Sequence, residues 1–127
     1  MQSKELALAA ARALDDKKGV KILVLDVQHL TIIADYFVIA SGRSANQVRA
    51  LIDEVDDKLS ELGENPRRRE GTNEGRWAVL DYGNVLVHVF HEQEREYYNL
   101  ERLWMDGSNQ VEFVQNEGRS EERRVGK

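Results

Sequence analysis

The sequence predicts a single α/β domain in which helices pack on the faces of a β-sheet. Helical and strand-like segments follow one another in the order α-β-β-α-β-β-β-α. Two strand segments, residues 20–27 and 85–90, are apolar on both faces, which is typical of internal strands that are covered on both sides. The 127 residues contain no repeat, low-complexity stretch or linker. One layered domain with five strands is therefore expected.

Residues 3–40 predict one helix and two strands. Ser3 is a suitable N-cap for a helix over residues 3–14, where apolar side chains recur on one face. A charged turn then leads to the internal strand at residues 20–27. Residues 36–40 form the second predicted strand.

The second predicted helix has the clearest local signal. Ser44 and Gln47 match the S-x-x-Q capping box, in which two side chains satisfy free backbone amides at a helix start. The acidic cluster at residues 53–57 lies opposite the apolar stripe and is expected to face water. Gly63 is the expected end of the helix. The stripe consists of Val48, Leu51, Ile52, Val55, Leu59 and Leu62.

Three further strands are predicted after this helix. Residues 65–70 contain Pro66 and three arginines, which favours an edge strand, because proline cannot donate to a neighbour and charge discourages edge pairing. Residues 77–82 and 85–90 are joined by a Gly-Asn pair, a signal for a two-residue hairpin. The strand at residues 85–90 is expected to be central.

The last predicted helix covers residues 92–104. If its apolar side packs on the sheet, Tyr98 and Asn99 turn outward. Trp77 and Asp81 likewise share one face of their predicted strand. Exposed aromatic side chains beside polar ones are typical of interface hot spots, although packing of the helix end is the alternative. The packed side is expected to contain Tyr97, Leu100, Leu103 and Trp104.

Residues beyond position 107 are expected to form a tail. The sequence predicts little order there, apart from local docking of Val111, Phe113 and Val114, so the domain is expected to span residues 1–107 and the tail residues 108–127. The last nine residues, RSEERRVGK, match the translation of a common sequencing-adapter read-through. The hypothesis is that the native protein ends or diverges near Gly118.

Composition and charge exclude several classes of protein. The chain has no cysteine, which excludes a disulfide framework, a thiol nucleophile and a cysteine-ligated metal. It has no apolar run near the ~20 residues that span a bilayer, and no signal or transit pattern at its start, so a cytoplasmic protein without membrane contact is expected. The net charge of −5 disfavours nucleic-acid binding and suits a basic protein partner.

Two patterns contain residue types used in catalysis, and each has a simpler structural explanation. His88, His91 and Glu92 are possible metal ligands, but positions three apart on a strand point to opposite faces. Buried or capping histidines are therefore favoured. Residues 41–44, SGRS, precede a helix as phosphate-binding loops do, but they lack the P-loop lysine and glycine pattern, which favours a simple N-cap. We expect no metal and no cofactor.

Three sequence blocks resemble the Iojap family of ribosomal silencing factors. Residues 35–42, DYFVIASG, are similar to the family's D-Y-F-V-I-A-[ST]-G motif. Residues 77–90, WAVLDYGNVLVHVF, resemble its second block, and residues 91–104, HEQEREYYNLERLW, resemble its most characteristic block. The resemblance covers about residues 4–106. Tyr97 departs from the family, in which phenylalanine is common at this position.

The resemblance implies a mixed sheet of about five strands flanked by helices, with nucleotidyltransferase-like topology. It does not imply that enzyme's chemistry, which needs paired metal-binding carboxylates on a strand after a Gly-Ser motif. Here the segment after Ser41 is a predicted helix whose acids face water. No enzymatic activity is therefore expected.

The resemblance also implies a translational repressor that binds the large ribosomal subunit. Family members bind the fourteenth large-subunit ribosomal protein on the intersubunit face, block joining of the small subunit and lower translation when nutrients are short. Direct nucleic-acid binding is not required, and homodimers are possible. The expected contact residues, of which the three charged ones in the helix lie at the rim, are Trp77, Asp81, Glu92, Glu94, Arg95, Tyr98, Asn99 and Leu100.

Two alternatives remain open from the sequence. One is a nucleotidyltransferase-like enzyme with Ser41 and Asp35 near a nucleotide. The other is an adaptor that acts on free proteins and not on ribosomes.

Overall fold

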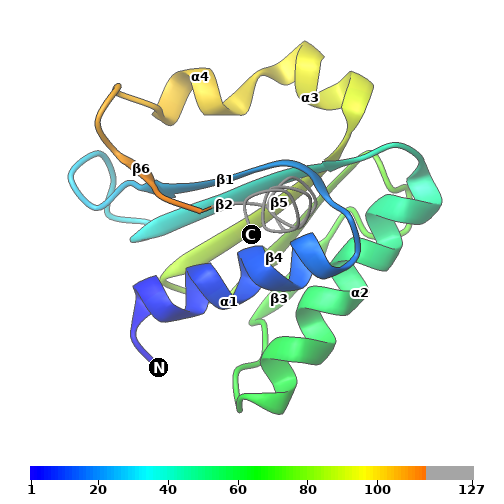
Figure 1. Ribbon diagram of the computed structural model, residues 1–127, viewed down its shortest axis with the longest axis horizontal. Helices are drawn as coiled ribbons and strands as arrows, with labels where there is room; N and C mark the ends of the chain where they lie inside the picture. Colours follow the sequence, from blue (N-terminus) through cyan, green and yellow to red (C-terminus); the bar gives the residue numbers. More distant parts are fainter. Residues whose placement is uncertain (114–127) are drawn as a thin grey trace, which may run out of the picture.

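A six-stranded sheet lies between two pairs of helices (Figure 1). The computed structural model describes residues 1–113, and within them no helix is long and apolar enough to cross a bilayer. The helices are α1 Ser3–Asp16, α2 Ala45–Glu61, α3 Glu92–Tyr98 and α4 Leu100–Trp104. The strands are β1 Val20–Asp26, β2 Tyr36–Gly42, β3 Arg68–Glu70, β4 Trp77–Asp81, β5 Val85–His91 and β6 Gln110–Val111.

The sheet is mixed, as expected, with the strand order β3-β4-β5-β2-β1-β6. β2 and β5 are parallel, and every other neighbouring pair is antiparallel. β1 and β5 are internal strands, which confirms the prediction made from their apolar faces.

The sequence predicted five strands and the sheet has six. The additional strand, β6, has only two residues and was therefore not recognised in the sequence. It pairs with β1 through Val111 opposite Val24 and Gln110 opposite Leu25. Two residues show no periodicity, so only the pairing defines this strand. Val111 and Phe113 pack against the core as predicted, so packed residues continue past position 107. The predictions for Val114 and for residues 119–127 fall outside the described residues.

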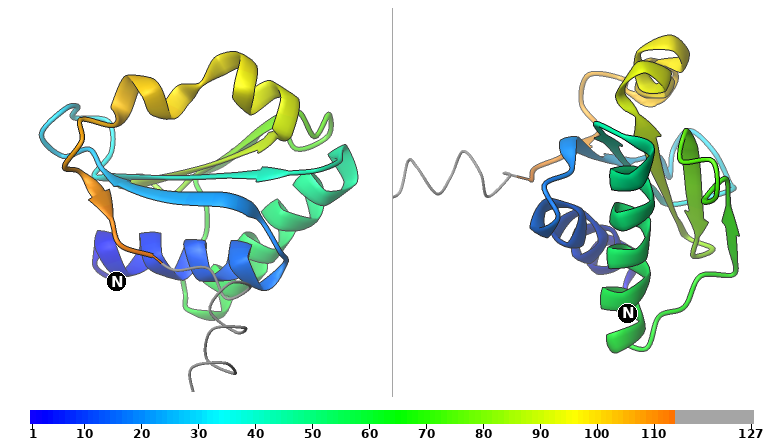
Figure 2. Two further views of the ribbon diagram at one scale, coloured as in Figure 1. Left: turned by 45° about the horizontal axis from the view of Figure 1, so that its top comes forward. Right: turned by 90° about the vertical axis from the view of Figure 1, so that its right-hand side faces the viewer.

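The sheet separates the core into two unequal parts, and Figure 2 shows helices over each of its two faces. α1 and α2 cover one face of the sheet and bury the larger cluster, in which Leu14, Leu51 and Ile52 are fully buried. α3 and α4 lie over the other face. The smaller cluster there contains Leu25, Val27, Ala34, Phe37, Ile39 and Phe90.

The two long helices start differently from one another. At α2, the Ser44 hydroxyl accepts from the Gln47 amide at 3.0 Å, and the Gln47 side chain accepts from the Arg43 amide at 2.6 Å. The predicted capping interaction is confirmed, although the return bond reaches Arg43 and not Ser44. The prediction for Ser3 is wrong: Gln2 precedes the helix, and the Ser3 hydroxyl donates to the Asp35 carboxylate at 2.9 Å.

The edge strand β3 is attached to α2 by ion pairs. Arg69 lies 2.6 Å from a carboxylate oxygen of Asp56 and 3.0 Å from one of Asp53. The prediction of an edge strand is confirmed. The acidic side of α2 is therefore not simply solvated, because two of its carboxylates hold the strand that lies beside it.

The hairpin between β4 and β5 is tight, as predicted. The Tyr82 amide donates to the Val85 carbonyl at 2.9 Å. Gly83 adopts φ 90°, a left-handed conformation that glycine adopts without steric cost. Its amide donates to the Asp81 carboxylate at 2.7 Å, which fixes the turn.

Candidate functional site

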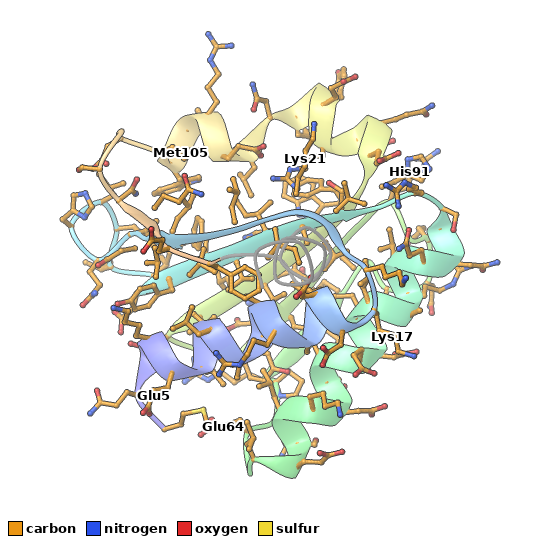
Figure 3. The ribbon with its side chains drawn as sticks, in the orientation of Figure 1. Glu5, Lys17, Lys21, Glu64, His91 and Met105 are labelled. Atoms are coloured by element: carbon orange, nitrogen blue, oxygen red, sulfur yellow. The ribbon has the colours of Figure 1, made fainter. Side chains whose placement is uncertain are left out.

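The segment that follows β5 forms two short helices and not one. Figure 3 labels His91 at the start of α3 and Met105 just after α4. Between them Asn99 adopts φ 49° and ψ 52°, the left-handed region that asparagine tolerates better than most residues. The prediction of one continuous helix over residues 92–104 is therefore wrong.

Arg95 explains how the two short helices are held at this break. Only 6% of the residue is exposed. Its Nε donates to Glu101 of α4 at 3.1 Å, and its Nη1 donates to the Ser41 hydroxyl at 3.0 Å and to the Val20 carbonyl at 3.3 Å. The prediction of Arg95 as a rim contact is wrong. The break turns Glu101 back toward Arg95, and the buried guanidinium then ties α3 and α4 to β1 and β2.

A polar pocket of about 450 Å³ lies at this break. Glu101 lines it, and one of its carboxylate oxygens is buried without a hydrogen-bond partner. A larger groove of about 710 Å³ lies on the α1 and α2 side, and no predicted contact residue lines it. The smaller pocket is lined by Val20, Lys21, Ser41, Glu92, Gln93, Arg95, Glu96, Asn99 and Glu101.

Trp77 is the centre of an aromatic cluster between β4, β5 and α3. Its ring stacks on Phe90 at a centroid distance of 4.8 Å and contacts Tyr98 at 4.9 Å. Trp77 remains half-buried. The cluster thus links the sheet to the outer surface of α3.

The division of the two tyrosines differs from the prediction. Tyr97 is 79% exposed and Tyr98 is 48% exposed, so Tyr97 does not pack on the sheet and Tyr98 lies against Trp77. Leu103 was expected on the packed side and is exposed. Leu100 and Trp104 do pack on the smaller cluster, as predicted. The break at Asn99 rotates α4 relative to α3, so one helical stripe cannot describe both.

His88 lies under this cluster. The Trp77 indole nitrogen can only donate, and it lies 3.1 Å from Nδ1 of His88. The neutral ring therefore carries its proton on Nε2, which is buried without a partner. Burial lowers the pKa of His88 to about 4.

His91 has a different role from His88. Its Nδ1 accepts from the Gln93 amide at 3.2 Å and caps α3. The interpretation of the two histidines as buried and capping residues is confirmed. Among residues 1–113, no three or more possible ligands are grouped to hold a metal ion.

The remaining predicted residues do not all lie together. Trp77 and Asp81 share a face of β4, as predicted, but they lie at its two ends. The Asp81 carboxylate is engaged by the Gly83 amide at 2.7 Å and by Arg68 at 3.5 Å. Asp81 is therefore committed to the hairpin, away from the aromatic cluster.

The surface around α3 carries the other predicted residues. Glu92 is exposed and lies 3.9 Å from Arg43, and Glu94, Asn99 and Leu100 are half-buried. Glu92 and Glu94 also sit in the first turn, where negative charge favours the helix. α3 thus carries both an acidic first turn and Tyr98 of the aromatic cluster.

One exposed apolar segment was not among the residues predicted from the sequence. Leu30, Ile32 and Ile33 are exposed in the loop between β1 and β2, and Ile32 is fully so. His29 of this loop lies 2.7 Å from the Asp106 carboxylate, and this hydrogen bond, together with those from Ser108, lowers the pKa of Asp106 to about 2. The sequence does contain a signal for this segment: two adjacent isoleucines lie between two predicted strands, where no strand or helix is available to bury them.

Comparison with known proteins identifies the family. A family model described as "RsfS: Ribosomal silencing factor during starvation" matches residues 1–126. A Bacillus subtilis ribosomal silencing factor is 46% identical over 106 residues, which cover 84% of this chain and 90% of that protein. The chloroplastic Iojap protein of Zea mays is 32% identical over 77% of this chain and 42% of its own length.

A solved structure supports the same assignment. A crystal structure of a Chromobacterium violaceum protein superposes with a TM-score of 0.80 at 38% identity, and it covers 88% of this chain and 95% of that one. Sequence and fold therefore agree, and the chain belongs to the ribosomal silencing factor family, to which the Iojap proteins are related.

Proposed function

We propose that this protein represses translation by binding the large ribosomal subunit and blocking its association with the small subunit. The proposed contact is the fourteenth large-subunit ribosomal protein on the intersubunit face. The family model and the relatives, which are described as ribosomal silencing factors, support action on the ribosome. A cytoplasmic location is part of this proposal.

The aromatic surface around Trp77 carries the proposal. Tyr98 lies on Trp77 and still exposes about half of its surface, so a large amphipathic side chain is held in place and remains available to a partner. Such rigid aromatic anchors contribute strongly to protein interfaces, because little side-chain freedom is lost on binding. Asn99 and Leu100 adjoin this centre on the chain.

The charge of this surface favours a basic partner. Glu92 and Glu94 lie in the first turn of α3, the helix that also carries Tyr98. Acidic side chains at an interface rim steer a basic protein toward it and repel the phosphates of RNA. We therefore propose Glu92 and Glu94 as rim contacts. Arg95 is excluded as a contact by its burial, and Asp81 is at most a peripheral one.

The enzyme alternative loses support from the geometry. It required Ser41 and Asp35 near one nucleotide, but these residues lie at opposite ends of β2, roughly 20 Å apart at the rise of a strand. Ser41 accepts a hydrogen bond from Arg95, and Asp35 accepts one from Ser3. Both side chains therefore have structural roles. Magnesium-dependent turnover of ATP or GTP that is lost in Asp35→Ala would restore this alternative.

The experiment is a sucrose gradient of purified ribosomal subunits with and without the protein. We expect the protein to migrate with the large subunit and the fraction of joined ribosomes to fall. An unchanged fraction of joined ribosomes at saturating protein would refute the proposed repression. If the protein stays at the top of the gradient, the adaptor alternative is favoured. Sedimentation equilibrium of the free protein would test the proposed homodimer.

A further inference from the structure

We propose that residues 28–33, the loop between β1 and β2, form a second docking element that inserts an apolar tip into a basic protein surface of the large subunit. The inference rests on the proposed function, and it adds an interaction surface outside the aromatic cluster. Its first support is exposure: Ile32 is fully exposed, and Leu30 and Ile33 are also exposed. These three are among the large apolar side chains that the fold leaves in water.

The loop presents its tip in an ordered conformation. The amides of Leu30 and Thr31 donate to the Val27 carbonyl at 2.9 and 3.1 Å, and the Ile33 amide donates to the Thr31 hydroxyl at 3.2 Å. An internally bonded loop loses little conformational entropy when it binds. The exposed isoleucines are therefore suited to act as a pre-organised anchor.

The loop is also joined to the surface that carries α3 and α4. The His29 ring lies 2.7 Å from Asp106, which follows α4. Figures 1 and 2 show this light-blue loop projecting from the end of the sheet beside the end of α4. Leu103 and Met105, at that end of α4, are exposed as well. The apolar tip thus continues the proposed interface.

Charge identifies the kind of partner. Asp26 and Asp35 bracket the loop, and Asp106 lies against it through His29. His29 is the only basic side chain in residues 26–35. An apolar tip with acidic side chains at its base complements a protein surface that combines an apolar depression with lysine or arginine. RNA is disfavoured because its phosphates would meet these carboxylates.

The test compares exposed apolar residues on the two sides of the protein. Ile32→Ser and Leu62→Ser are made in the full chain, and binding to purified large subunits is titrated by cosedimentation. Leu62, at the end of α2, is also exposed, on the opposite side of the sheet. We expect Ile32→Ser to weaken binding about tenfold and Leu62→Ser to change it less than twofold. Ile32→Ser should keep the wild-type melting temperature, because Ile32 is fully exposed, and Leu62→Ser should lower it only slightly, because about half of Leu62 is exposed.

Salt separates the apolar contribution from the charged one. The loss caused by Ile32→Ser should be similar at low and high salt, whereas the loss caused by Asp106→Asn should shrink as salt rises. Wild-type affinity for Ile32→Ser would overturn the inference while leaving the proposed function intact. The inference would also be overturned if Ile32→Ser changed the oligomeric state without changing subunit binding. Tight binding of the wild type to protein-free large-subunit RNA would overturn it as well. Failure of the wild type to bind at all would refute the proposed function itself.

Discussion

The two faces of the sheet differ in how they are covered. On one face, α1 and α2 bury a large aliphatic cluster, and α2 is a regular helix of 17 residues with a capped start. On the other face, α3 and α4 have seven and five residues and are separated by a left-handed asparagine. Their contact with the sheet consists of the smaller cluster, which includes Phe37 and Phe90, and one buried arginine.

This difference indicates that the two faces have different roles. A face that only stabilises the fold can bury its apolar side chains completely, as Leu51 and Val55 are buried. On the α3 and α4 face, Tyr97, Leu103 and about half of Tyr98 are exposed to water. Exposed apolar side chains of this kind favour aggregation unless a partner covers them. We infer that the first face provides stability and the second face provides recognition.

Removing a core side chain on the α1 and α2 face should have the largest effect. Leu51→Ala is expected to lower the free energy of unfolding by about 3 kcal/mol, because the fully buried side chain leaves a cavity. Leu100→Ala, on the other face, should cost only about 1 kcal/mol, because Leu100 is half-buried. Urea titration measures both. Equal losses would contradict the division between the faces.

Acid should lower the stability of the protein through His88, which is buried beside Trp77. The pKa of His88 is about 4 in the folded protein and has its usual value of 6.5 in the unfolded chain. Between these two pH values, only the unfolded chain takes up the proton. Stability is therefore fully present above pH 6.5 and falls as the pH drops toward 4. From pH 7 to pH 5 the wild type should lose about 2 kcal/mol more than His88→Gln, which cannot titrate. Parallel pH profiles of the two proteins would show that His88 is not buried in its neutral form.

Arg95→Met should cost about 2 kcal/mol of stability, because it leaves the Glu101 carboxylate and the Ser41 hydroxyl without their partner. The value is placed below that of a fully buried pair, since the Glu101 side chain is 21% exposed. Arg43→Met is the control: its exposed pair with Glu92 at 3.9 Å should contribute less than about 0.5 kcal/mol. Thermal unfolding followed by circular dichroism measures both, and similar losses would remove the positioning role of Arg95.

The two tyrosines should give the smallest effects on stability. Tyr98→Ala removes a ring contact with Trp77 and should cost about 1 kcal/mol. Tyr97→Ala should change the free energy of unfolding by less than about 0.5 kcal/mol, because the side chain is mainly in water. Trp77 fluorescence should respond to the first substitution and not to the second. A larger loss for Tyr97→Ala would restore the packing predicted from the sequence.

Local sequence signals predicted the α1 and α2 face well. The Ser44 and Gln47 cap and the apolar stripe of α2 depend on residues close together in the chain, and of that stripe only Leu62, just past the helix end, is exposed against expectation. The glycine hairpin before β5 is an equally local signal. Such short-range patterns are readable without knowledge of the rest of the fold.

The α3 and α4 face depends on distant residues, which explains the errors made there. A stripe of period 3.6 cannot reveal that Arg95 meets Ser41, 54 positions earlier in the chain. Nor does it indicate that Asn99 leaves the helix. The same limit applies to Trp77 and His88, whose hydrogen bond joins two strands, and to the two-residue strand β6. Sequence patterns therefore indicated the surface that we propose for recognition but assigned some of its side chains to the wrong side.

The most direct test of recognition by the α3 and α4 face compares the affinities of Tyr98→Ala and Leu62→Ala for purified large ribosomal subunits. The two side chains have nearly equal exposure, 48% and 52%, and lie on opposite sides of the sheet. Truncation of an aromatic anchor costs ~2 kcal/mol in an interface, so Tyr98→Ala should lose roughly thirtyfold in affinity. Leu62→Ala should bind as the wild type does. Equal affinities of both variants, or a loss confined to Leu62→Ala, would contradict the assignment of recognition to the α3 and α4 face.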